Sequence, residues 1–79
     1  MNTQEAQRAI EQALGQVAPD ADLAALPADA DFRDALELDS LDFLNFVERL
    51  SNAVGRRIDE DDYPKLATLA SASAFIAGR

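Results

Sequence analysis

The sequence of 79 residues contains no cysteine and no histidine. Without cysteine it can form neither a disulfide nor a metal site built on thiolates. Histidine is the commonest general base in enzymes, and the chain also has only one lysine, Lys65, and one tyrosine, Tyr63. Carboxylate pairs are available, but a glycosidase-type pair needs a cleft that a chain of this length rarely forms. We therefore expect a protein that has no catalytic activity of its own.

Basic residues are also scarce, with 7 lysines and arginines against 15 aspartates and glutamates and a formal net charge of −8. This charge repels phosphate backbones and anionic membranes and favours basic protein partners, so we expect no nucleic-acid binding. The N-terminal stretch MNTQEAQRAI contains no apolar run of the kind found in a signal peptide or a membrane span. The predictions are a single domain over residues 1–79, a monomer, no membrane insertion and a cytoplasmic location.

The acidic runs of the sequence lack the pattern of a calcium site. An EF-hand loop needs oxygen ligands at alternating positions, a central glycine and a closing glutamate. Neither PDADLAALPADADF nor DEDDYPKLATL has this pattern. We expect no metal site.

The N-terminal third of the chain has the spacing of one amphipathic helix followed by a long loop. Asn2 and Glu5 are spaced as a capping pair, and Pro19 ends the helix, which predicts a helix over about residues 3–17. Its inward face recurs at three-four spacing: Ala6, Ala9, Ile10, Ala13, Leu14 and Val17. In the loop that follows, three apolar residues can pin the chain to a core: Leu23, Leu26 and Phe32.

A second helix is expected to start at Asp39 or Ser40 and to end before Gly55. Asp39 and Asp42 have the spacing of an N-cap and N3 pair, and Gly55 is the natural residue after the last turn. A plot at about 100° per residue gives the helix an inward face: Phe43, Phe46, Val47, Leu50 and Val54. The opposite face carries these residues: Leu41, Leu44, Asn45, Glu48 and Asn52. Arg56 and Arg57 are interpreted as a solvated pair that complements the negative helix end.

The C-terminal part predicts a short helix and then a longer one. Pro64 restricts DEDDYPKL to a brief helical turn, Thr68 caps the last helix and Gly78 stops it. The inward face of the last helix is expected to contain four residues: Leu69, Ala72, Phe75 and Ile76. The chain shows no strand-like alternation. The predicted fold is an all-α four-helix bundle of three main helices and one short helix, with a long crossover loop after the first helix.

The residues around Ser40 carry a resemblance to a known family. Serine beside aspartate at a helix start is ordinarily a cap. Here, however, DSLD at residues 39–42 follows FRDALEL after a long loop, and IDEDDYPKLATL precedes the last helix. An acidic helical chain of this size with that motif resembles a freestanding acyl carrier protein over nearly its whole length.

The resemblance implies that Ser40 carries a covalent 4′-phosphopantetheine arm donated by coenzyme A, whose thiol holds acyl groups as thioesters. The implied partners are a phosphopantetheinyl transferase, an acyl-loading ligase or acyltransferase, and the synthase enzymes of fatty acid, polyketide or related synthesis. The residues expected to contact these partners surround Ser40: Asp39, Leu41, Asp42, Leu44, Asn45 and Glu48. The residues expected to line an acyl pocket are Phe43, Phe46, Val47 and Leu50. Two phenylalanines there would fill much of such a pocket, which favours short or polar cargo.

The chain departs from the family pattern at several positions. Glu37 replaces the glycine usual three residues before the serine, Pro64 shortens the third helix, and Ser73 lies where a core residue is usual. Two alternatives stay open. One is an aminoacyl or peptidyl carrier, although such carriers usually have Gly-Gly-x-Ser where this chain has LELDS. The other is a helical adaptor whose serine is unmodified.

Overall fold

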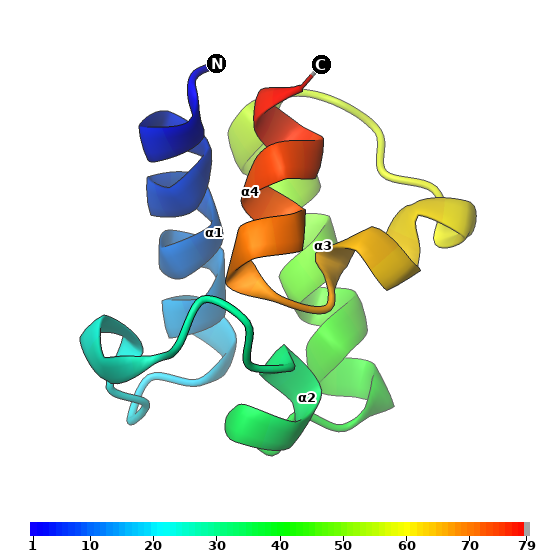
Figure 1. The fold of residues 1–79 in the computed structure, drawn as a ribbon. Coiled ribbons are helices and arrows are strands. Elements are labelled where there is room, and N and C mark those ends of the chain that lie inside the picture. Colours follow the sequence, from blue (N-terminus) through cyan, green and yellow to red (C-terminus); the bar gives the residue numbers. More distant parts are fainter. Residues whose placement is uncertain (79) are drawn as a thin grey trace.

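The computed structural model describes residues 1–78 and folds into a small bundle of helices (Figure 1). The three longest helices are α1 (Thr3–Val17), α3 (Ser40–Val54) and α4 (Leu69–Ala77). The shorter elements are the 3-10 turn η1 (Leu23–Ala25), helix α2 (Phe32–Ala35) and the 3-10 helix η2 (Glu60–Leu66). The predicted all-α fold of three main helices and one short helix before the last is confirmed. No helix within residues 1–78 has the length and apolar character needed to cross a membrane.

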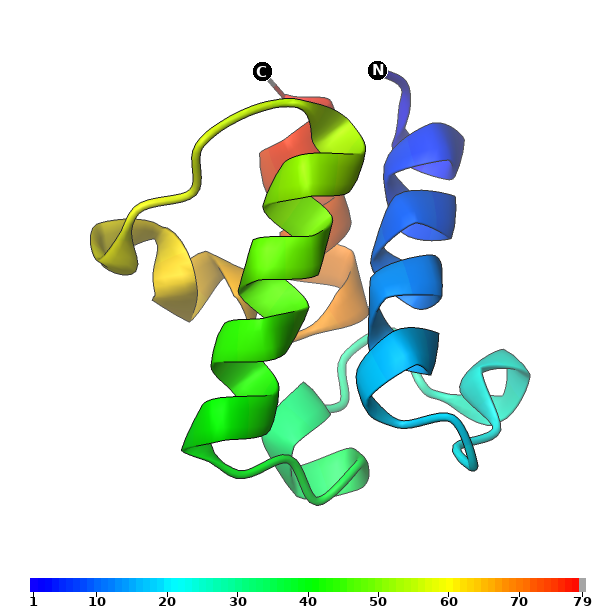
Figure 2. The ribbon, with the colours of Figure 1, turned by 180° about the vertical axis from the view of Figure 1, so that it is seen from behind.

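Helix α1 lies against both α3 and α4, which run back toward the end at which α1 begins (Figures 1 and 2). Its first turn is closed by the predicted capping pair, in which Glu5 N–H donates to Asn2 Oδ1 at 2.8 Å and Asn2 N–H donates to Glu5 Oε1 at 3.1 Å. Ile10 and Leu14 of this helix are fully buried in the core. Because the caps and the apolar spacing are local features, the sequence predicted the bounds of this helix correctly.

The core is centred on the inward face of α3. As predicted, that face is buried from Phe43 to Leu50, while Val54 at its end is half-buried. Phe46 packs edge-on against Phe32, with ring centroids 5.6 Å apart, and neither ring is exposed. Helix α4 contributes three of its four predicted inward residues as buried core: Leu69, Ala72 and Ile76. Phe75, the fourth, is half-buried and packs on the margin of the core.

The segment between α1 and α3 is held to the core as predicted, but it is not only a loop. Leu23 and Leu26 are half-buried against the core, and Phe32 is fully buried. Residues 32–35 form the short helix α2, which the sequence did not predict. This single turn forms because the Asp31 carboxylate accepts hydrogen bonds from the N–H groups of Arg33 and Asp34, at 2.9 and 3.2 Å.

Two backbone hydrogen bonds fasten the chain before α2 to the beginning of α4. Phe32 N–H donates to the carbonyl of Ala67 at 2.8 Å, and Ala70 N–H donates to the carbonyl of Ala28 at 2.9 Å. Thr68 lies between these two contacts and caps α4, as predicted, and Ser71 completes a capping box with it. The position of α2 therefore depends on residues far along the chain.

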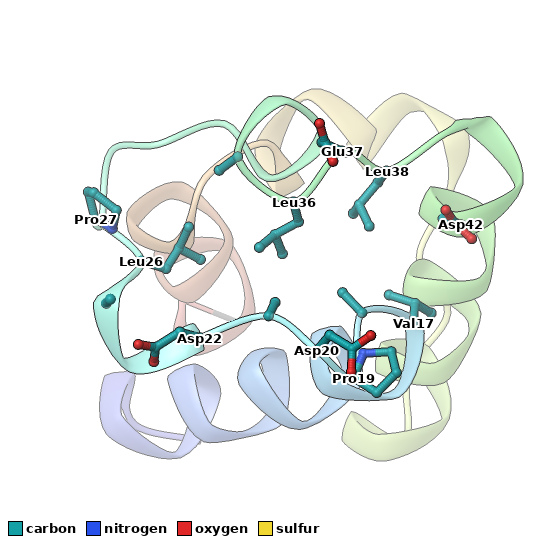
Figure 3. Close-up of a pocket in the computed structure, with 14 residues that line it drawn as sticks. Val17, Pro19, Asp20, Asp22, Leu26, Pro27, Leu36, Glu37, Leu38 and Asp42 are labelled. Atoms are coloured by element: carbon teal, nitrogen blue, oxygen red, sulfur yellow. The ribbon is translucent and has the colours of Figure 1, made fainter.

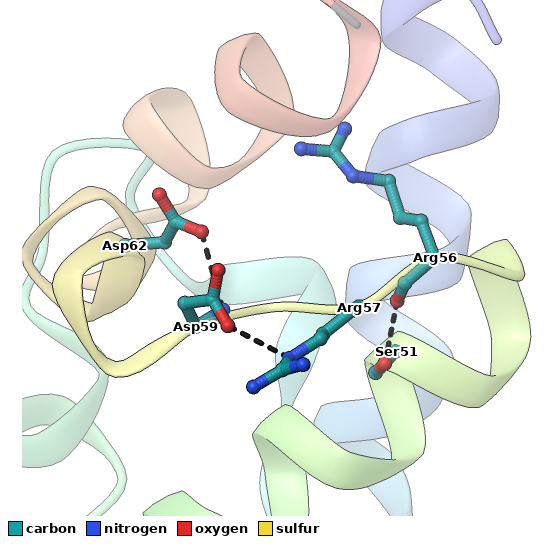
Figure 4. Close-up of polar contacts among 5 residues, drawn as sticks. All are labelled: Ser51, Arg56, Arg57, Asp59 and Asp62. Carbon is teal, nitrogen blue, oxygen red and sulfur yellow. Dashed lines mark hydrogen bonds and ion pairs between the residues drawn. The ribbon is translucent and has the colours of Figure 1, made fainter.

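The end of α3 turns through Gly55, whose φ of 71° lies in the left-handed region that favours glycine. The Ser51 hydroxyl donates to the Arg56 carbonyl, and Arg57 pairs with Asp59 at 2.8 Å (Figure 4). The expectation that Arg56 and Arg57 are both solvated was wrong for Arg56. Its guanidinium carbon lies 4.6 Å from the centre of the Phe75 ring, and one of its terminal nitrogens is buried.

The Ser40 site at the start of helix α3

Ser40 is the first residue of α3. Two aspartates on either side of it, Asp39 and Asp42, cap the helix. Asp42 N–H donates to Asp39 Oδ1 at 2.8 Å, and Asp39 N–H donates to Asp42 Oδ2 at 3.4 Å. This confirms the predicted capping box. Because Asp39 supplies the cap, the hydroxyl of Ser40 is not needed for helix stability.

Ser40 is the exposed serine among the four serines of the chain. The Ser51 hydroxyl donates a hydrogen bond to the Arg56 carbonyl, the Ser71 hydroxyl takes part in the cap of α4, and Ser73 is buried. Each of these three hydroxyls is thus used or enclosed by the fold. Ser40 is therefore the serine whose side chain is open to solvent.

The backbone around Ser40 suits a negatively charged substituent. The N–H groups of Ser40 and Leu41 belong to the first helical turn and have no carbonyl partner within the helix. They lie at the positive end of the helix dipole, which favours an anion. The carboxylates of Asp39 and Asp42 oppose this effect, although each is engaged with a backbone N–H group.

The turn that leads into Ser40 is fixed on both sides. Leu38 is buried, and its N–H donates to the Arg33 carbonyl at 3.0 Å. Glu37, which precedes it, has a φ of 54° in the left-handed region, where a residue with a Cβ is strained. The resembled family usually has glycine at this position, the residue that the left-handed region favours. The hydroxyl of Ser40 is therefore presented from an ordered turn.

A cleft of about 400 Å³ opens beside Ser40. Phe43 and Leu44 of α3 form one wall, Tyr63 and Pro64 of η2 form another, and Arg33 of α2 lies at its edge with Ser40. The rings of Phe43 and Tyr63 meet edge-on at 5.5 Å. Among the residues expected to line an acyl pocket, Phe43 lines this cleft, and the other three are enclosed in the core: Phe46, Val47 and Leu50.

A second cavity of about 570 Å³ lies between α2 and the loop that follows α1 (Figure 3). The apolar side chains of Leu26 and Leu36 line this cavity. Four carboxylates line it as well: Asp20, Asp22, Glu37 and Asp42. Ser40 is not among its lining residues. The cleft on the η2 side is thus the one that the Ser40 hydroxyl shares.

The surface around Ser40 is more apolar than the net charge suggests. Leu41 is 66% exposed and Leu44 is 47% exposed, and the predicted neighbours Asn45 and Glu48 are exposed as well. Arg49 is drawn away from this surface because its guanidinium donates to Gln16 of α1 at 3.0 Å. Two large apolar side chains are therefore exposed beside Ser40.

The sequence did not point to Arg33 as part of the site, yet its guanidinium reaches Ser40 Oγ at 3.5 Å. Its position directly after Phe32, which anchors α2 in the core, was the only signal available. The short turn α2 brings Arg33 to the Ser40 hydroxyl, and local spacing cannot reveal such a tertiary contact.

These features define a class of protein: a small acidic helical domain that holds out one hydroxyl beside an apolar cleft and contains no histidine to activate it. The sequence model of the phosphopantetheine attachment site family matches residues 4–76, and the chain belongs to this family. Its members carry covalently attached 4′-phosphopantetheine and are in general carriers without catalysis, which interact with phosphopantetheinyl transferases and with synthases or ligases. No curated protein matches the chain.

Proposed function

We propose that this chain is an acyl carrier protein in which Ser40 is the attachment point of the phosphopantetheine arm. The observation that carries the proposal is the exposed Ser40 hydroxyl at the start of α3. This hydroxyl is not needed as a helix cap, because Asp39 caps α3. When attached, the arm supplies the thiol on which acyl groups are held as thioesters. The role belongs to fatty acid, polyketide or related synthesis, and a cytoplasmic location stays a prediction.

The modification reaction can be written with Ser40 as the nucleophile. Ser40 Oγ forms a bond to the pantetheine-bearing phosphorus of coenzyme A, and the phosphoanhydride bond breaks. Adenosine 3′,5′-bisphosphate leaves with the electron pair of that bond, and the hydroxyl proton passes to a base. The chain has no histidine and the carboxylates of Asp39 and Asp42 are engaged in the cap, so the base belongs to the transferase.

The cleft beside Ser40 is proposed as the place where a short acyl group lies. Its walls include the rings of Phe43 and Tyr63, whereas Phe46, whose ring centre lies 6.0 Å from that of Phe43, is fully buried in the core and does not line the cleft. An acetyl or butyryl thioester should therefore shift the NMR signals of Phe43 and Tyr63 and leave Phe46 unchanged. Large shifts at Phe46 with an octanoyl thioester would show that long chains enter the bundle and would contradict this assignment.

The exposed leucines beside the arm are proposed as the contact surface for the transferase and for the loading and synthase enzymes. Leu41 and Leu44 supply the apolar contact, and Asp42 and Glu48 supply limited electrostatic steering. Because any enzyme that accepts the arm must approach Ser40, these residues lie within its footprint. Asp39 and Asn45 complete the proposed contact surface.

Intact mass after incubation with coenzyme A and a promiscuous phosphopantetheinyl transferase tests the attachment. The wild-type chain should gain the mass of one arm, and Ser40→Ala should gain none while its circular dichroism stays helical, because Asp39 still caps α3. Ser51→Ala is the matched control and should be loaded like the wild type, since the Ser51 hydroxyl is engaged by Arg56. A loaded Ser40→Ala variant would contradict the assignment, and an unmodified wild-type chain would favour the adaptor alternative.

A further inference from the structure

The Arg33 side chain lies beside the Ser40 hydroxyl, although it comes from a different helix. Its backbone is bonded on both sides, because its N–H donates to Asp31 Oδ1 at 2.9 Å and its carbonyl accepts from Leu38 N–H at 3.0 Å. Its guanidinium carbon lies 5.6 Å from the centre of the Phe43 ring. The terminal nitrogen Nη2 is 3.5 Å from Ser40 Oγ.

The contacts of Arg33 leave its charge and most of its donors available. A guanidinium has five N–H donors, and stacking over a ring uses its face and leaves the edge free. Within residues 1–78 the ion pairs shorter than 4.0 Å are Arg57 with Asp59 and Lys65 with Asp62, so Arg33 is in none of them. Asp31, the carboxylate that shares the cleft, accepts the backbone N–H groups of α2.

Without Arg33, an anion attached to Ser40 would be repelled by the negative charges around it. Asp39 and Asp42 place carboxylates in the first turn, and the chain as a whole carries a formal net charge of −8. A phosphodiester on Ser40 is bonded directly to the oxygen that Arg33 already reaches. Arginine pairs with phosphate oxygens through two parallel N–H donors and with a strength that neutral donors lack.

The geometry points to Arg33 as the residue that binds the phosphodiester formed on Ser40, an inference that rests on the attachment proposed above. The pairing offsets the repulsion from Asp39 and Asp42. It also holds the phosphate on the α2 side of Ser40, so that the arm begins at the mouth of the cleft walled by Phe43. Arg33 is thus a positioning residue for the arm and takes no part in the chemistry of the cargo.

The test compares unloaded and loaded protein by NMR, with intact mass measured first on every sample. In the wild type, loading should slow hydrogen exchange at the Arg33 Nε–H by about 1.5- to 5-fold, the factor that corresponds to an exposed ion pair. The ³¹P resonance of the loaded phosphodiester should move in Arg33→Gln and stay closer to its wild-type position in Arg33→Lys, which keeps the charge. Arg8→Gln removes the same charge from an exposed site on α1 and should leave the ³¹P resonance in place.

The possible failures are distinguishable. If the wild type gains the arm on Ser40 but neither the Arg33 exchange rate nor the ³¹P resonance responds, the Arg33 assignment is overturned and the attachment stands. If Arg8→Gln moves the ³¹P resonance as much as Arg33→Gln does, the effect comes from net charge and the assignment is again overturned. If no mass is gained at Ser40, both the attachment and the phosphate contact are overturned.

Discussion

Ser73 on α4 offers a direct test of how the core is packed. The residue is 4% exposed, and within residues 1–78 its hydroxyl oxygen has no hydrogen-bond partner. A buried hydroxyl without a partner costs about 1–3 kcal/mol, and alanine is also the better helix former by a few tenths of a kcal/mol. Ser73→Ala should therefore raise the free energy of unfolding by about 1–2 kcal/mol. For a domain of this size that corresponds to an increase in Tm of about 6–12 °C.

Urea denaturation followed by circular dichroism measures the change, and an unaltered m-value would show that it arises in the native state. Ser71→Ala is the matched control on the same helix. Its hydroxyl accepts hydrogen bonds from the Thr68 N–H and hydroxyl groups at 3.3 and 2.9 Å, so its removal should lower stability by about 0.5–1.5 kcal/mol. If Ser73→Ala is neutral or destabilising, the Ser73 hydroxyl has a partner in solution and the reasoning fails.

Three further changes probe the turn, the core and the docking surface. In urea denaturation, Glu37→Gly should raise stability by about 0.5 kcal/mol, because relief of the left-handed strain exceeds the entropy that glycine adds to the unfolded chain, whereas Glu37→Val should lower it. Phe32→Ala should cost about 3–5 kcal/mol, measured in the same way, because its ring is fully buried against Phe46; a cost under 1 kcal/mol would contradict the packing. By calorimetric titration, Leu44→Ala should weaken binding to a cognate enzyme by about 1–2 kcal/mol, and a doubled ionic strength should change it less; steep salt dependence with no effect of Leu44→Ala would refute apolar docking.

The sequence predicted the elements whose determinants are local. The bounds of α1 follow from the Asn2 and Glu5 pair and from three-four spacing, and the start of α3 follows from the Asp39 and Asp42 pair. Each pair lies within one helical turn, so no knowledge of the rest of the chain is needed. The exposure of Ser40 could be predicted for the same reason.

The remainder of the site depends on contacts between distant segments. Helix α2 has a single turn, too short to show a period, and its place is set by the hydrogen bond from Phe32 to Ala67. The cleft exists because η2 brings Tyr63 against Phe43, and the half-buried Arg56 places its guanidinium over the ring of Phe75 in α4. Spacing along the sequence carries no information about these pairs, so Arg33 and the outline of the cleft were missed.

The backbone bonds between residues 28–32 and the start of α4 also have a consequence for synthesis. Ala70 is made 42 residues after Ala28, its hydrogen-bond partner, which at about 5–20 residues per second is a delay of roughly 2–8 s. During that interval residues 28–32 lack the two backbone hydrogen bonds that fasten them to the beginning of α4. The part of the site that α2 holds is therefore complete only after residues 67–70 have been synthesised.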